Sequence, residues 1–154
     1  MKSAIELSSL LVVGWIAGAE LGSWWCVQPV VARLPYEQYV VAEQGMLRTF
    51  GRIMPVLMPL SGVLAIMLVL LSRGESGFVF WLRAAAALCL ALSVVTTLRV
   101  NVPINTRTAS WQTSNDASEW QSMRHRWHVF QGVRGGLYGA AFLLLSIPLV
   151  ASRH

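Results

Sequence analysis

Charged residues are scarce in this chain. Asp, Glu, Lys and Arg make up only 12% of its 154 residues, against roughly 25% in a typical soluble domain. The two cysteines, Cys26 and Cys89, lie near the end and in the middle of different hydrophobic stretches, so a disulfide between them is not expected. A glycine-rich phosphate loop, a Cys-x-x-Cys pair and a nucleophile elbow are all missing. The sequence therefore excludes an ordinary soluble domain and offers no common nucleotide or redox motif.

Hydrophobic sequence is abundant instead. Hydrophobic residues make up 55% of the chain, and the mean hydropathy is +0.56. A membrane-spanning helix needs about 20 mostly apolar residues. The chain is therefore predicted to be all-α, an integral membrane four-helix bundle that forms one domain over residues 1–154. The four predicted spans are Ile5 to Val27, Ile53 to Leu71, Phe78 to Val100 and Val129 to Val150.

The first span is not expected to be a cleaved secretion signal, because its apolar core is too long and it lacks a small-x-small cleavage site. The basic residues give a formal net charge of +5 but are scattered among predicted helix ends, so a nucleic-acid partner is rejected. We expect the partners to be membrane lipid and a lipophilic small molecule, and the location to be the bacterial inner (plasma) membrane. The basic residues leave the orientation open.

The segment between the first and second spans has the pattern of a helix that lies in the membrane interface. Apolar residues recur on one helical face, with charged residues between them. We predict that this interfacial segment turns into the second span near Pro55 and Pro59. Several N-cap residues within 114–118 predict that the helix of the fourth span starts well outside the bilayer. The apolar face of the interfacial segment comprises Tyr36, Val40, Leu47, Phe50 and Met54.

Glycines recur at helical spacing in the first and fourth spans. Strips of small residues let another helix approach closely. They predict close packing either between these two spans or between two copies of the chain, which leaves a homo-oligomer open. The strips are Gly14, Gly18 and Gly22 in the first span, and Gly132, Gly135, Gly136 and Gly139 in the fourth.

Glu20 lies well inside the first span, and Trp24 follows one turn later on the same predicted face. The dipeptide Gln28-Pro29 is expected to end this helix. An ionisable side chain at such depth is costly and is by default a hypothesis of function. Glu20 is either a general base or the partner of an arginine, such as Arg99 or Arg134, that fixes helix packing.

Polar side chains gather where the third span ends and the fourth begins. The segment 101–105 carries two asparagines around Pro103, which we expect to break the third helix. At the start of the fourth span, four side chains at spacings of four, three and four share one helical face, and His128 lies beside it. We predict that these groups form one site; alternatively, the asparagines only cap the helix and the arginine extends to the headgroups. The four side chains are Trp127, Gln131, Arg134 and Tyr138.

Taken together, these motifs resemble those of the anthrone oxygenase-like family of small four-span membrane proteins. The resemblance lies in an Asn-x-Pro-x-Asn motif at the end of the third span, and in an Arg-x-Arg-Trp motif followed by a further arginine before the fourth. Fungal relatives in that family are associated with oxidising anthrones to anthraquinones without a cofactor. Many relatives have a histidine at the position of Gln131. The resemblance implies roles for Asn101, Pro103, Asn105, Arg126, Trp127 and Arg134.

The implied reaction needs a base and hydrogen-bond donors. An anthrone has an acidic C–H conjugated with its ring carbonyl, so a base and donors to the enolate oxygen generate an anion that reacts with dioxygen. We expect Glu20, His128 and Arg134 to be catalytic. The residues expected to bind the substrate are Trp24, Asn101, Pro103, Asn105, Arg126, Trp127, Gln131 and Tyr138.

No cofactor is expected. The two internal histidines, His125 and His128, share one predicted helix and cannot ligate a haem from two sides. They are also too few for a convincing metal site. The competing hypothesis is a non-enzymatic membrane protein that binds a lipophilic molecule or serves as an accessory subunit. Such a protein would use the same pocket without needing Glu20 as a base.

Overall fold

The computed structural model describes residues 2–151, and every regular element in that range is helical. The helices combine into four continuous stretches, each long and apolar enough to cross a membrane. The predicted all-α four-span architecture is confirmed, and the protein is an integral membrane protein. The elements are α1 (Lys2–Gly22), a π-helical turn η1 (Ser23–Val27), α2 (Gln28–Val31), α3 (Tyr36–Leu71), α4 (Gly77–Thr96), a second π-helical turn η2 (Thr97–Asn101), α5 (Val102–Ala109) and α6 (Ala117–Ala151).

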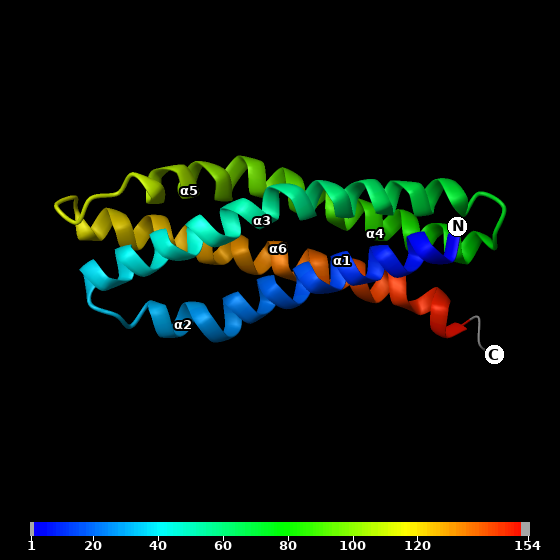
Figure 1. Ribbon diagram of the computed structural model, residues 1–154, viewed down its shortest axis with the longest axis horizontal. Helices are drawn as coiled ribbons and strands as arrows, with labels where there is room; N and C mark the ends of the chain where they lie inside the picture. Colours follow the sequence, from blue (N-terminus) through cyan, green and yellow to red (C-terminus); the bar gives the residue numbers. More distant parts are fainter. Residues whose placement is uncertain (1, 152–154) are drawn as a thin grey trace.

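The stretches form an elongated bundle in which α6 packs against both α1 and α4 (Figure 1). The first and last described residues lie at one end of the bundle, together with the short turn between α3 and α4. The turn between α2 and α3 and the longer loop between α5 and α6 lie at the opposite end. This places α3 and α4 antiparallel, as the sequence predicted.

Large apolar side chains are found both inside the bundle and on its outer surface. Ile16, Leu90 and Tyr138 are fully buried in the core between the helices. Leu11 and Trp81 are 65% and 70% exposed. An apolar outer surface of this kind suits contact with lipid chains, and it would be costly in water.

The prolines expected to break helices lie within continuous helical stretches, so those predictions were wrong. Pro29 follows η1, and Pro103 follows η2. A π-helical turn shifts the hydrogen-bond register and widens the helix, which accommodates a proline ring and its missing N–H. Residues 36–54 are helical as predicted, but α3 runs on through Pro55 and Pro59 without the predicted turn. In a membrane, breaking the helix at these prolines would leave backbone N–H and C=O groups without hydrogen bonds, which is more costly than keeping the helix continuous.

The glycines of α1 and α6 contact the opposite helix only in part. A Cβ atom on Gly14 would lie 2.8 Å from the Phe142 ring, and one on Gly132 would lie 2.7 Å from the Trp24 ring. Gly18 and Gly22 have no such neighbour among the described residues. The two spans therefore do pack closely, but Gly18 and Gly22 take no part in that contact.

The loop between α5 and α6 is fixed to the beginning of α3. Gln44 Nε2 donates hydrogen bonds to the backbone oxygens of Thr108, at 3.1 Å, and Trp111, at 2.9 Å. Trp111 Nε1 donates to the Tyr36 hydroxyl at 2.9 Å, and that hydroxyl donates to the Asn115 backbone oxygen at 3.1 Å. These bonds hold α5 in place beside α3 and α6.

Candidate functional site

A cavity of about 450 Å³ lies between the helices, in the half of the bundle that ends at the loop between α5 and α6. Its volume falls in the range of roughly 300–1,000 Å³ that small-molecule sites occupy. Most of its wall is apolar, and a few polar side chains enter it at defined points. The apolar wall includes Met46, Leu47, Phe50, Met54, Met58, Val94 and Val102.

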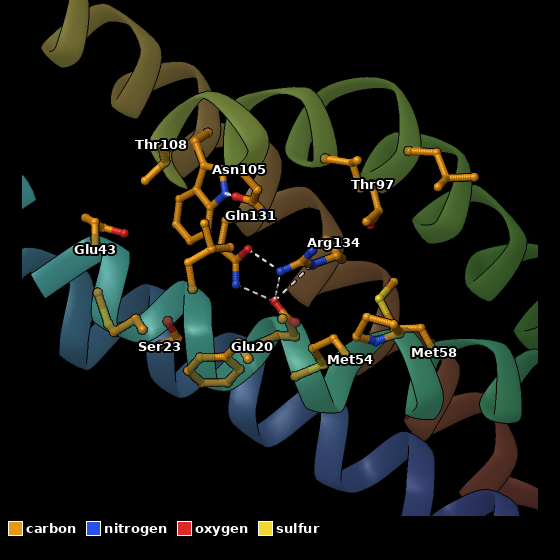
Figure 2. A pocket seen from close by; sticks show the side chains of 18 of the residues that line it. Glu20, Ser23, Glu43, Met54, Met58, Thr97, Asn105, Thr108, Gln131 and Arg134 are labelled. Carbon is orange, nitrogen blue, oxygen red and sulfur yellow. Dashed lines mark hydrogen bonds and ion pairs between the residues drawn. The ribbon is translucent and has the colours of Figure 1, made fainter. Parts of the chain in front are cut away.

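The polar centre of the cavity is the carboxylate of Glu20, which is only 2% exposed (Figure 2). Arg134 donates to its Oε2 atom from Nε at 3.0 Å and from Nη2 at 2.7 Å. Gln131 Nε2 donates to the same oxygen, and Arg134 Nη2 also donates to Gln131 Oε1. Glu20 thus pairs with Arg134, as one of the two sequence hypotheses required, and Arg99 is exposed.

The two carboxylate oxygens of Glu20 have different surroundings. Oε2 receives all three donated hydrogen bonds, whereas Oε1 receives none from the described part of the chain. A buried ion pair is stable only when further hydrogen bonds satisfy its polar atoms, and Gln131 supplies one here. The cluster therefore fixes the carboxylate in place and leaves one oxygen available to a molecule in the cavity.

A second buried ion pair in the cavity wall was not predicted from the sequence. Glu43 Oε2 of α3 lies 2.6 Å from Arg124 Nη2 of α6, and both side chains are 4% exposed. Both residues line the cavity, as does the buried Gln28. The Arg124 guanidinium carbon also lies 4.2 Å from the centroid of the Trp127 ring, which adds a cation–π contact.

A signal for this pair was present in the sequence. Glu43 lies three residues after Val40 and four before Leu47, on the face of α3 that was expected to be apolar. Arg124 lies three residues before Trp127 and so continues the helical face predicted for α6. A charged residue on each of two buried faces is evidence for pairing between them.

Asn105 and Trp127 connect α5 to α6 at the cavity wall. Trp127 Nε1 donates a hydrogen bond to Asn105 Oδ1 at 2.8 Å. Both residues line the cavity, together with Gln131, Arg134 and Glu20. The structure therefore brings together five of the residues that the sequence assigned to one site.

Other predicted site residues lie elsewhere. His128 and Trp24 stack on each other, with ring centroids 5.5 Å apart, outside the wall of this cavity. His128 instead lines a second cavity with Gln28 and Tyr39. Because consecutive residues of a helix are rotated by about 100°, His128 cannot share the face of Trp127. His128 therefore lies apart from the five predicted residues that share the cavity, and its role as the base stays a prediction.

The remaining four predicted residues also lie outside the cavity wall. Asn101 is fully buried in η2, and neither of its side-chain polar atoms has a hydrogen-bond partner in the described chain. Pro103 and Arg126 are exposed. Tyr138 is buried below the cavity, where its hydroxyl shares a hydrogen bond of 3.2 Å with Ser61.

A further cluster of charged side chains, Lys2, Glu6, Glu75 and Arg83, lies outside the cavity. Within residues 2–151, no group of three or more His, Cys, Asp or Glu side chains is arranged to hold a metal ion. Cys26 and Cys89 are both free thiols. The two buried ion pairs are thus the main polar features of the cavity.

Comparison with known proteins gives one match. The sequence model of a family described as anthrone oxygenase matches residues 46–144, well over half of the chain. That range contains Glu43's partner Arg124 and also Asn105, Gln131 and Arg134, while Glu20 lies before it. No curated protein and no solved structure matches the chain.

Proposed function

The chain belongs to the anthrone oxygenase family, and from this premise we propose that it is a membrane-embedded, cofactor-independent oxygenase of a lipophilic aromatic substrate. The substrate has an acidic C–H that is conjugated with a ring carbonyl, as anthrones do. The observation that carries this proposal is the Glu20 carboxylate, one oxygen of which accepts no hydrogen bond from the described residues, in a cavity whose wall is mostly apolar. A helical protein of this kind suits the bacterial inner membrane, which we propose as its location.

Glu20 is positioned to accept the proton of the substrate carbon. Oε1 takes the proton, while Oε2 remains held by Arg134 and Gln131. The electron pair of the broken C–H bond moves to the ring carbonyl, which becomes an enolate oxygen. The Arg134 guanidinium, which lies beside Glu20 in the cavity wall, is the cationic donor for that oxygen, and its effect is strengthened by the low dielectric of the site.

The enolate is electron-rich enough to reduce dioxygen. One electron passes to dioxygen, and the resulting radical pair combines into a C–O bond, giving a peroxide that is protonated by Glu20. Glu20 then removes the second proton from the same carbon as the O–O bond breaks, which leaves a ketone and hydroxide. Hydroxide takes the proton and departs as water. In sum, a CH₂ group and one dioxygen give a carbonyl group and one water.

The test is oxygen uptake by the purified protein with anthrone-like and phenolic substrates, corrected for uptake without protein. Glu20→Gln should lower the turnover number by about 10²-fold or more, because an amide cannot accept the proton. Glu6→Gln is the matched control, since Glu6 lies on α1 like Glu20 and pairs with the buried Arg83 of α4, but lies outside the cavity. The absence of uptake by the wild-type protein with every substrate would contradict the proposal.

A non-enzymatic binding protein is the second candidate, and the Glu20–Arg134 ion pair is the observation that favours it. A buried ion pair between α1 and α6 can fix helix packing without taking part in any reaction. In that case the wild-type protein would bind anthraquinone without consuming oxygen. Binding would also persist in a Glu20→Gln variant that remains folded.

A further inference from the structure

The wall of the 450 Å³ cavity is most exposed at the outer surface of the bundle where it is apolar, and its polar residues are buried or only partly exposed. The charged side chains of the wall, such as Glu20 and Arg134, are buried. Five residues of the wall are exposed, and none has a polar side chain. These residues are Gly51, Pro55 and Pro59 of α3, Leu98 of η2 and Val102 of α5.

The five exposed residues form two facing edges. Gly51, Pro55 and Pro59 follow each other at spacings of four, so they share one face of α3. Leu98 and Val102 are also four residues apart and form the opposite edge. Figure 2 shows Met54 and Met58 of α3 on one side of the cavity and Thr97 of η2 on the other.

The α3 edge carries little side-chain bulk, because its exposed residues are one glycine and two prolines. A Cβ atom on Gly51 would have no other atom within 4 Å, so the position has open space beside it. The polar end of the same cavity, by contrast, is closed by the buried Gln28 and by the ion pair of Glu43 with Arg124. A molecule that came from water at that end would have to displace a buried ion pair.

We propose that the gap between α3 and η2–α5 is a lateral portal through which a flat aromatic molecule passes directly from the bilayer into the cavity. The identity of the substrate rests on the proposed function; the portal itself rests on the distribution of exposed wall residues. The portal opens near Arg52 and Arg99, where the apolar spans meet the polar ends of the helices. Polycyclic aromatic molecules concentrate in the membrane, so a lateral route brings them to Glu20 without a passage through water.

The test measures how fast anthraquinone, which cannot be oxidised at the same carbon, associates with the protein in lipid nanodiscs. Quenching of tryptophan fluorescence reports binding, because Trp127 lines the cavity. Gly51→Leu should lower the association rate constant by about fivefold or more, since the added side chain narrows the portal. Gly62→Leu is the matched control on the same helix, because Gly62 also has open space but lies outside the cavity wall.

A second pair of variants tests the opposite edge. Val102→Phe should slow association. Val95→Phe is the matched control and should not, because the two valines are almost equally exposed, at 42% and 43%. Only Val102 lines the cavity. Equal rates in both matched pairs, or no binding by the wild-type protein, would overturn the portal. If Gly51→Leu and Val102→Phe slow association but the wild-type protein consumes no oxygen, the portal is supported and the proposed oxygenase activity is rejected.

Discussion

The ion pair between Glu20 and Arg134 gives the sharpest prediction for stability. Arg134→Met removes the two hydrogen bonds of 3.0 and 2.7 Å that Arg134 donates to Oε2. Hydrogen bonds to a charged group contribute about 1.5–3 kcal/mol each, and breaking a buried ion pair costs about 3–5 kcal/mol. We therefore expect Arg134→Met to lower the free energy of unfolding by about 3–5 kcal/mol.

The double variant Glu20→Gln/Arg134→Met should be less damaged than the sum of its parts. It removes both charges together, so neither is left buried and unpaired. The double-mutant cycle should show a coupling of at least about 2 kcal/mol. The free energies come from unfolding of the purified protein in mixed micelles, followed by far-ultraviolet circular dichroism. Additivity within about 0.5 kcal/mol would refute the claim that these two residues form one buried unit.

A parallel cycle at Glu6 and Arg83 is the control for this reasoning. Glu6 is 17% exposed, and Arg83 also contacts Ser72 and Glu75. Because Arg83 keeps other partners when Glu6 changes, the coupling in this cycle should be smaller than at Glu20. A coupling of equal size would mean that burial and the number of partners do not set the strength of such pairs in this bundle.

Two further predictions concern packing and the loop. Gly132→Ala should lower the free energy of unfolding in the same micelle assay by about 1–3 kcal/mol, because the new Cβ atom would collide with the Trp24 ring. Gly136→Ala is the control and should be nearly neutral, because Gly136 has open space beside it. A neutral Gly132→Ala would refute this packing. Tyr36→Phe removes the hydroxyl that accepts from Trp111 Nε1, and it should speed proteolysis of the loop between α5 and α6; unchanged cleavage would show that this bond does not hold the loop.

Much of the fold was predictable because a segment that crosses lipid must be long, apolar and internally hydrogen-bonded. Four long apolar stretches required four helices, and the short turn after Leu71 required antiparallel neighbours. The continuity of the helices at Pro29 and Pro103 was not predictable by the same reasoning. Whether a proline ends a helix or follows a π-helical turn depends on the surroundings of the backbone, which the local sequence does not specify.

The site was predictable only where helical spacing controls it. Trp127, Gln131 and Arg134 share one face, and the structure places all three in the cavity wall. His128 was included for its chemistry, although its spacing places it on another face. The partner of Glu20 could not be chosen from sequence, because the choice depends on how α1 and α6 are aligned along the bundle.

The buried ion pairs also constrain the order in which the protein can be completed during synthesis. Glu20 belongs to the first span and Arg134 to the last, 114 residues later. At roughly 5–20 residues per second, a ribosome needs on the order of ten seconds to make that interval. During this time α1 lies in or at the membrane with a polar carboxyl group whose partner does not yet exist. Insertion of α6 therefore adds the last span and also supplies the arginine that pairs with Glu20 of the first span. A chain that stops before Arg134 keeps an unpaired acidic group, which cellular quality control can recognise.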